Sequence, residues 1–160
     1  MKKILDVPYF RQSKDNTCLP TSVAMVLNYY GENILEQGVV NNCKRDLTGY
    51  FYKGKLISFL RNLDFSVSVS NNNSLGRLIS LIDREIPPLV RVGFFNTGFP
   101  HWMVVKGYDL DNEWIYFNDP IGKIVDHLDF ENFEKMSKVY KRNNNCERSK
   151  NKILLIHPRD

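Results

Sequence analysis

The order of its periodic segments constrains the fold of this chain more than any other feature. Apolar residues at helical spacing dominate the first half, whereas the second half is rich in Val, Ile and aromatic residues interrupted by turn residues. This order predicts an α+β fold, with N-terminal helices packed on a C-terminal antiparallel sheet. The 160 residues contain no long linker and no internal repeat, so we predict a single domain over 1–160.

The strongest helical pattern begins at Thr17 or Cys18 and stops at Gly31. Asn16 or Thr17 can cap its start, and Pro20 is tolerated because it lies in the first turn. The pattern therefore predicts a helix with Cys18 at its N-terminus. Weaker helical patterns follow at Ile34–Asn41, Lys55–Asn62 and Leu75–Arg84.

Short runs of β-branched and aromatic residues predict the strands. They lie at Phe65–Val69, Pro88–Phe95, His101–Tyr108, Glu113–Asn118, Lys123–His127 and Ile153–His157. Asp111-Asn112 provides a hairpin turn between two of these runs, and Pro120-Ile121-Gly122 provides the next one. Consecutive strands of the second half are therefore predicted to pair in an antiparallel manner.

The chain is mildly basic, with a formal net charge of +4 and a pI near 8.9. Basic residues become denser toward the C-terminus, but aromatic residues are not interleaved with them regularly, so no nucleic-acid partner is predicted. The ordinary interpretation of such a distribution is a solvated face. Attraction to a polyanion such as a bacterial cell wall is the alternative.

The N-terminus lacks the pattern of a secretory signal. Asp6 and Pro8 interrupt the apolar run, whereas a signal contains about 7–15 apolar residues in succession. No apolar stretch approaches the roughly 18 residues needed to span a bilayer. We therefore expect a protein that is cytoplasmic as synthesised and not inserted in a membrane, and that leaves the cell by lysis if it acts outside.

Three cysteines, Cys18, Cys43 and Cys146, cannot form a disulfide framework without leaving one thiol over. They lack the C-x-x-C spacing of a zinc site, and the three histidines show no ligand spacing either. We therefore expect no metal and no cofactor. Whether Cys43 and Cys146 pair in an oxidising compartment stays open, and a reactive thiol is the question that the cysteines raise.

Cys18 is a candidate nucleophile because it begins a helix. Unpaired backbone N–H groups and the helix dipole favour a negative charge there, and the thiolate is the nucleophilic form of cysteine. The alternative for Cys18 alone is a small apolar residue of the core. His101 opens its predicted strand, and an imidazole beside a thiol can take the thiol proton. In isolation, a strand histidine is more often a packed core residue.

Asp119 and Gln12 complete the candidate site. If Asp111-Asn112 turns a hairpin, the end of the strand before Asp119 lies beside the start of the His101 strand, within reach of the imidazole. A carboxylate on the far ring nitrogen orients such a base. Otherwise, Asp119 is an ordinary turn residue. Gln12 can supply a side-chain amide to an oxyanion hole, together with the backbone N–H of Cys18.

Four motifs resemble those of the bacteriocin-processing, double-glycine-leader peptidases and their stand-alone relatives. Val7–Gln12 and Asn16–Ser22 resemble the start of that family, in which a glutamine, five residues and then Cys-Gly-Pro open a helix. His101–Tyr108 is similar to the histidine strand of the family, and Asn118–Pro120 is similar to its acid motif. The motifs occur in the family's order, over most of the chain.

The resemblance implies a papain-like cysteine peptidase fold, a Cys18/His101/Asp119 catalytic triad and Gln12 at the oxyanion hole. Together with the residues themselves, it predicts a cysteine endopeptidase that hydrolyses a peptide bond through a thioester intermediate. Three substrate classes fit: a leader peptide, a peptidoglycan peptide, as for a phage endolysin, and a host or regulatory protein.

One departure from the family is Leu19, which stands where glycine usually follows the nucleophile. Leu19 and Trp102, the residues after the nucleophile and the base, are the candidate substrate contacts, and Leu19 is expected to alter substrate preference. Two alternatives to the hydrolase remain. One is a catalytically silent peptide-binding module, and the other is a papain-like acyltransferase or deamidase that uses the same triad. The oligomeric state is not predicted.

Overall fold

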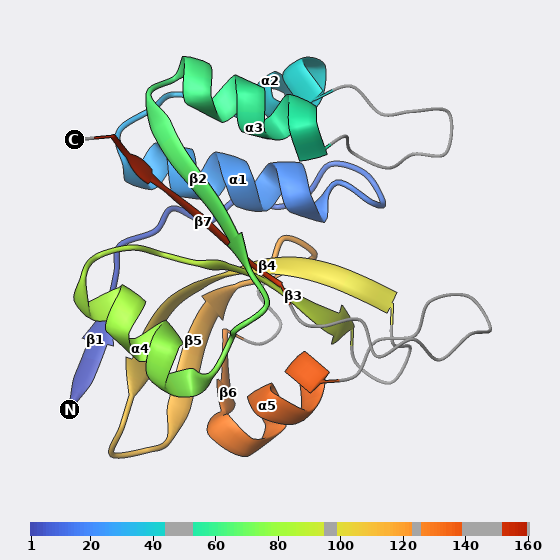
Figure 1. Cartoon of the computed structure of the whole chain (residues 1–160). Coiled ribbons are helices and arrows are strands. Elements are labelled where there is room, and N and C mark those ends of the chain that lie inside the picture. Colours follow the sequence, from blue (N-terminus) through green and yellow to red (C-terminus); the bar gives the residue numbers. More distant parts are fainter. Residues whose placement is uncertain (44–52, 95–98, 123–125, 139–151, 160) are drawn as a thin grey trace.

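A computed structural model of the chain describes residues 1–43, 53–94, 99–122, 126–138 and 152–159. A central antiparallel sheet has helices α1, α2 and α3 on one side and helices α4 and α5 on the other (Figure 1). The helices are α1 (Cys18–Tyr29), α2 (Glu36–Cys43), α3 (Lys53–Asn62), α4 (Leu75–Asp83) and α5 (Phe130–Lys138). The predicted α+β class is therefore confirmed.

The sheet runs in the order β2-β7-β3-β4-β5-β6, and β1 pairs separately with β4. Every pairing is antiparallel. The strands are β1 (Lys2–Ile4), β2 (Phe65–Ser70), β3 (Leu89–Phe94), β4 (Phe99–Asp109), β5 (Trp114–Asn118), β6 (His127–Asp129) and β7 (Ile153–Pro158). The expected run of neighbouring hairpins is present from β3 to β6, whereas β7 inserts between β2 and β3.

Two elements of the structure were not predicted. β1 has only three residues, too few to show a periodicity, and it exists because it pairs with β4. α5 is short and mostly polar, but Asp129 caps it by accepting a hydrogen bond from Asn132 N at 2.8 Å. Phe133 then anchors the helix, since its side chain is fully buried. An aspartate three residues before an amide donor is a signal of a helix start that the helical periodicity does not contain.

The strand predicted over Lys123–His127 lies mostly outside the described residues. β6 begins at His127, where the predicted strand ends, and residues 123–125 lie outside the described part of the chain. β6 pairs with β5 through Tyr116 opposite His127. The position of β6 therefore depends on its pairing with β5, and a local residue pattern does not predict such a pairing.

Helix α1 runs through the interior of the molecule, and all its residues from Pro20 to Leu27 are buried. It contacts α2 on one side and β4 on the other. Its start is not capped as predicted. Thr17 occupies the N-cap position, but its hydroxyl donates to Lys14 O at 2.7 Å and makes no capping hydrogen bond. The Thr17 side chain therefore does not accept a hydrogen bond from the backbone N–H groups at the start of α1.

No helix among the described residues has the length and apolar character required to cross a bilayer.

Strand β4 connects the parts of the molecule on which the candidate site depends. Its first half pairs with β3, where Val92 lies opposite His101. Its second half pairs with β5, where Val104 lies opposite Asn118. A bulge between Val105 and Gly107 interrupts this register and lets β4 bend locally.

Gly107 follows the bulge. A glycine fits this position because β1 passes close to the backbone there. A Cβ atom at this position would lie 2.5 Å from Lys3 O and 2.9 Å from Ile4 Cα. Directly after β1, Leu5 N donates to Lys106 O at 2.7 Å. The N-terminal segment is thus held against β4 before it continues toward Gln12.

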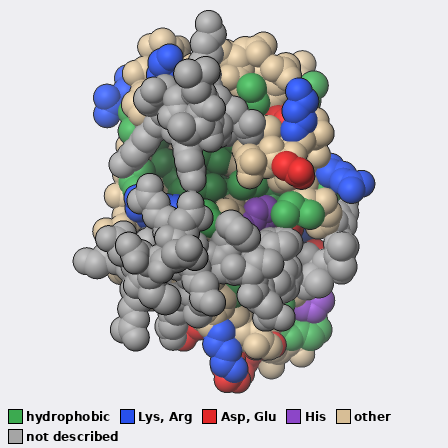
Figure 2. Space-filling view, turned by 90° about the vertical axis from the view of Figure 1, so that its right-hand side faces the viewer, with side chains coloured by type: hydrophobic (Ala, Val, Ile, Leu, Met, Phe, Trp, Pro, Cys, Tyr) green, Lys and Arg blue, Asp and Glu red, His purple; other side chains and the backbone are tan. Residues whose placement is uncertain are grey.

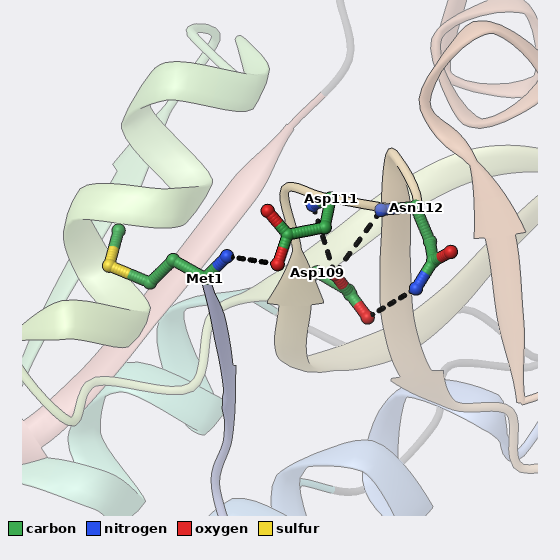
Figure 3. A network of polar contacts seen from close by, with 4 residues as sticks. All are labelled: Met1, Asp109, Asp111 and Asn112. Atoms are coloured by element: carbon green, nitrogen blue, oxygen red, sulfur yellow. Dashed lines mark hydrogen bonds and ion pairs between the residues drawn. The ribbon is translucent and has the colours of Figure 1, made fainter.

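The turn that joins β4 to β5 is built around Asp109, whose side chain is almost fully buried (Figure 3). Its Oδ1 accepts hydrogen bonds from Asp111 N at 3.0 Å and Asn112 N at 3.3 Å, and its Oδ2 accepts one from Asn112 Nδ2 at 2.9 Å. Asp111 also pairs with the amino group of Met1. The predicted hairpin at Asp111-Asn112 is confirmed, and Asp109 is the residue that orders it.

Candidate active site

Cys18 is the first residue of α1. In Figure 1 the start of α1 and the start of β4 lie at the same side of the molecule. The Cys18 side chain is partly exposed, whereas the following turns of α1 are buried. One turn along α1, Ser22 Oγ donates to Trp102 O of β4 at 3.3 Å. The helix therefore holds the thiol beside the strand that carries His101.

His101 lies on β4 as its third residue, so it does not open the strand as predicted. The strand begins two residues earlier because Phe99 and Pro100 continue the pairing with β3, opposite Phe94 and Gly93. The His101 side chain is 4% exposed. Burial of the imidazole makes its hydrogen-bond partners decisive for its protonation.

Asp119 follows β5 directly and reaches the far nitrogen of the imidazole. His101 Nε2 lies 2.7 Å from Asp119 Oδ1. The same Oδ1 accepts a hydrogen bond from Ile121 N at 2.9 Å. Asp119 is therefore both a turn residue and the partner of the histidine, so the two alternatives considered for it from the sequence are both realised. The predicted contact between the start of β4 and the end of β5 is present.

Cys18 and His101 shift each other's protonation. Burial raises the pKa of Cys18, but the hydrogen bond and charge of His101, with backbone groups of Trp102 and Leu19, outweigh burial and lower that pKa below its ordinary value. Burial lowers the pKa of His101, but the hydrogen bonds to Asp119 and to Cys18 raise it to about 9. Both shifts have the same direction, toward a thiolate beside an imidazolium.

A backbone hydrogen bond brings Gln12 to the turn that contains Asp119. Its N–H donates to Pro120 O at 2.8 Å, one residue beyond Asp119. Among the described residues, its buried side-chain Oε1 has no hydrogen-bond partner. A buried amide with unused hydrogen-bonding capacity is uncommon. The structure thus places Gln12 near Asp119 through the turn that follows β5.

Leu19 packs into the interior of the helical layer. Its side chain lines a small apolar pocket with Pro20, Val39, Cys43 and Leu56, which joins the start of α1 to α2 and α3. The pocket has no room for a water molecule. In this position Leu19 contributes packing, and its predicted contact with substrate stays a prediction.

Trp102 lies opposite Arg91 in the pairing of β4 with β3. Since successive side chains of a strand point to opposite faces of the sheet, Trp102 and His101 project to different faces. Trp102 is partly buried against the core. Its predicted contact with substrate also stays a prediction.

Two further residues support the site and were not singled out from the sequence. Glu36 accepts hydrogen bonds from Ser13 and Thr21, on either side of Cys18. Asn118 Nδ2 donates to Val7 O at 2.9 Å. Asn118 stands in the acid motif, so the motif was a usable signal. Glu36 had none, because its contacts join residues 15 and 23 positions apart.

The other two histidines have different surroundings. His127 stacks against Trp114, with ring centroids 4.3 Å apart, and its Nδ1 lies 2.7 Å from Asp126 Oδ1. His157 Nδ1 lies 3.0 Å from Pro158 O. Across the described ranges, no group of three or more His, Cys, Asp or Glu side chains is placed to hold a metal ion. Cys18 and Cys43 are free thiols, and Cys146 lies outside the described residues.

The face of the molecule on the side where α1 begins is shown in Figure 2. Hydrophobic side chains gather in a hollow across its middle, with a histidine and an acidic side chain beside them. Lys and Arg side chains are scattered over this face and do not form one patch.

Comparison with known proteins gives a consistent picture. The model of the Peptidase_C39 like family matches residues 4–147. A search of curated proteins gave no match. A C39-like peptidase from Bacillus anthracis has a similar structure, with 20% identity, a TM-score of 0.71 and full coverage of both chains.

Two peptidase domains of transporters are also similar in structure. One is the double glycine motif protease of an AMS/PCAT transporter, solved with its leader peptide. It has 19% identity and a TM-score of 0.68, over 98% of this chain and 95% of that one. The other is the peptidase domain of Streptococcus ComA, with 15% identity and a TM-score of 0.66, over 96% of this chain and 99% of that one.

These structural neighbours share the papain-like fold expected from the sequence motifs. The family match covers most of the chain, including every candidate site residue. The chain therefore belongs to the Peptidase_C39 like family and is a cysteine peptidase.

Proposed function

We propose that the chain is an endopeptidase that cleaves peptide bonds with Cys18 as nucleophile, His101 as general acid and base, and Asp119 as the group that orients His101. One observation carries this assignment: a single imidazole hydrogen-bonds Asp119 through Nε2 at 2.7 Å and also hydrogen-bonds the Cys18 thiol. The thiol lies at the N-terminus of a helix, where a negative charge is favoured. A structural cysteine needs none of these contacts.

In the first half of the reaction, the Cys18 thiolate attacks the carbonyl carbon of the scissile peptide bond. The carbonyl oxygen becomes an oxyanion, and in this proposal the Gln12 amide N–H and the backbone N–H of Cys18 stabilise it. The His101 imidazolium then gives its proton to the leaving amine nitrogen as the C–N bond breaks. The products of this step are a thioester on Cys18 and a free amine.

In the second half, neutral His101 takes a proton from a water molecule that attacks the thioester carbonyl. The C–S bond breaks, the acyl group leaves as a carboxylic acid, and Cys18 returns to the thiolate beside an imidazolium. Asp119 holds the imidazole through Nε2, so that its other nitrogen faces the thiol in both halves. No cofactor enters either step.

For the substrate we propose a leader-type peptide that binds extended, with small residues before the cleaved bond. The support is indirect: a structural neighbour of 19% identity was solved in complex with a leader peptide. A peptidoglycan peptide is the second substrate class, and the mildly basic charge of the chain is compatible with it. The two classes are separable by experiment.

The test incubates the protein under reducing conditions with a synthetic double-glycine leader peptide and, in parallel, with purified peptidoglycan. Mass spectrometry of the products in H₂¹⁸O follows the reaction. Hydrolysis places one ¹⁸O in the new C-terminal carboxylate, whereas acyl transfer to an added amine places none. Deamidation leaves the peptide backbone uncut.

Cys18→Ala and Cys43→Ser serve as the paired variants in this test. The proposal requires cleavage that Cys18→Ala removes and Cys43→Ser keeps. Cleavage that survives Cys18→Ala would contradict it. Peptide binding without any cleavage, in wild type and variant alike, would identify the silent binding module instead.

A further inference from the structure

Glu36, the first residue of α2, receives three hydrogen bonds from the segment around the nucleophile. Its Oε2 accepts from Ser13 N at 2.8 Å, and its Oε1 accepts from Ser13 Oγ at 2.7 Å. Its Oε2 also accepts from Thr21 Oγ1 at 2.9 Å. The carboxylate therefore binds one residue with both of its oxygens and a second residue at the same time.

The partners of Glu36 lie on both sides of Cys18 in the sequence. Ser13 directly follows Gln12 and precedes Cys18, whereas Thr21 lies in the first turn of α1. Glu36 thus connects the loop before the nucleophile to the helix after it. Since α2 packs on α1, the connection is anchored in the helical layer of the molecule.

A carboxylate suits this position because all three partners are donors. Burial raises the pKa of Glu36, but the hydrogen bonds from Ser13 and Thr21 outweigh burial and lower that pKa below its ordinary value. Glu36 is therefore charged at neutral pH, and hydrogen bonds to a charged group are stronger than those to a neutral one.

The opposite side of the same loop is held by the turn that follows β5. Gln12 N donates to Pro120 O at 2.8 Å, so residues 12 and 13 bind to different layers. Gln12 is fixed to the turn that carries Asp119, and Ser13 is fixed to α2 through Glu36. Between these two anchors lies the Gln12 side chain, with its buried Oε1 unpaired among the described residues.

We propose that Glu36 is a positioning residue that holds the Gln12 amide in place to stabilise the oxyanion. The inference rests on the proposed function, because an oxyanion forms only if Cys18 attacks a carbonyl group. Glu36 acts through Ser13 and does not touch the reacting atoms. Its removal is therefore expected to impair the oxyanion hole while leaving the thiolate–imidazolium pair intact.

A double-mutant cycle between Glu36 and Gln12 tests this coupling. Gln12→Ala is expected to lower kcat by about 10²-fold or more, as for the loss of an oxyanion-hole donor. Glu36→Ala is expected to lower kcat by about 10-fold, with KM changed less than about twofold, since a small misplacement of a catalytic group lowers the rate of the chemical step. The double variant should be no slower than Gln12→Ala alone.

Two readouts separate positioning from general damage to the fold. The rate of Cys18 alkylation by iodoacetamide needs a thiolate but no oxyanion hole, so Glu36→Ala should leave it within about twofold of wild type. Binding of a peptide aldehyde, which forms an oxyanion on Cys18, should weaken in parallel with kcat. Glu36→Gln keeps one acceptor oxygen and should restore part of both losses.

Glu131→Gln is the matched control. It removes an exposed carboxylate that pairs with Lys135 on α5, far from the loop in sequence. This variant should match wild type in kcat, alkylation rate and aldehyde binding. If the losses from Glu36→Ala and Gln12→Ala multiply in the double variant, or if alkylation slows as much as turnover, the positioning role is wrong and the proposed function stands.

Failure of the proposed function has a different outcome. If the wild type shows no turnover that depends on Cys18, hydrogen exchange of residues 10–16 replaces the kinetic cycle. Exchange should then be at least about tenfold faster in Glu36→Ala than in Glu131→Gln, because the hydrogen bond of Ser13 N is lost. Without turnover there is no oxyanion for Gln12 to stabilise, so this experiment tests the anchoring of the loop by Glu36, and equal exchange in the two variants would overturn that as well.

Discussion

Two free thiols of this chain lie in contrasting surroundings. Cys18 begins α1 beside an imidazole and is partly exposed, whereas Cys43 ends α2 in an apolar pocket and is 1% exposed. Burial raises the pKa of Cys43 to about 11, with no opposing cause. Burial acts on Cys18 in the same direction, but His101 reverses the result and lowers its pKa.

The difference shows that burial alone does not distinguish a reactive cysteine from a structural one. Burial raises the pKa of both thiols, so both carry a desolvation penalty for the thiolate. What separates them is a charged partner and a helix start at Cys18. The two environments are also neighbours, because Leu19 lines the pocket that contains Cys43.

The largest expected effect is on turnover by Cys18→Ala. Removal of the nucleophile should lower kcat by on the order of 10⁴-fold or more, because members of a catalytic triad act as a unit. Cys43→Ser should keep kcat within about threefold, since the Cys43 side chain lies in the pocket among apolar residues. Steady-state kinetics on one peptide measures both variants. A strong loss in Cys43→Ser with native circular dichroism would remove the distinction between the two thiols.

The next effect is selective alkylation. At pH 7 the thiolate fraction of Cys43 should be about 10⁻⁴, because its pKa is about 11. Cys18 should react with iodoacetamide at least about 10³-fold faster than Cys43 in the folded protein. Peptide mapping after brief labelling measures the ratio, and labelling in denaturant equalises the two sites. Equal labelling without denaturant would mean that the two thiols share one environment.

Asp119 is expected to have a smaller effect than Cys18. Asp119→Ala should lower kcat by about 10²-fold, whereas Asp119→Asn should lose less, because an amide oxygen still accepts a hydrogen bond from His101 Nε2. The residual activities of the two variants, compared at one pH, measure how much of the effect comes from orienting the ring. Equal losses would assign the effect to the charge.

Activity should decrease on the alkaline side with a midpoint near pH 9, because the pKa of His101 is about 9. The hydrogen bond to Asp119 is the largest of the causes that raise this pKa, so Asp119→Ala should move the alkaline limb to lower pH. The contribution of His101 to the free energy of unfolding also decreases toward alkaline pH. Its folded pKa lies above the ordinary 6.5, so the contribution is complete below pH 6.5 and disappears as the pH rises through 9. An alkaline limb that does not move in Asp119→Ala would argue against this coupling.

Leu19→Gly is expected to change turnover least and stability most. Loss of a side chain from a filled apolar pocket, with glycine in a helix, should lower the free energy of unfolding by about 2–4 kcal/mol. Denaturant unfolding measures it. Peptide-library cleavage checks whether the preference also changes, as predicted from the departure of Leu19 from the family pattern. An altered preference with unchanged stability would place the Leu19 side chain on the substrate and not in the pocket.

Much of the fold was predictable because the residues that form these elements are close together in the sequence. The start of α1 and the β4–β5 hairpin follow from residues that are neighbours in the chain, such as Pro20 in the first turn and Asp111-Asn112 in the turn. β1 and the position of β6 were not predictable, because each forms through pairing with a distant strand. Asn16 or Thr17 was expected to cap α1, but Thr17 is at the N-cap position and its hydroxyl donates to Lys14 O instead.

For the candidate site, sequence alone determined which side chains are present, in what order, and which family they resemble. The Cys18, His101 and Asp119 motifs carry that information because each depends on a short stretch of chain. Tertiary structure alone decided the direction in which the pKa of the thiol shifts and the support of the loop before it. Both depend on contacts between elements far apart in the sequence: the 2.7 Å contact of His101 with Asp119 and the contacts of Glu36 across 15 and 23 residues. No local pattern encodes such contacts, because they form only when the helical layer and the sheet come together.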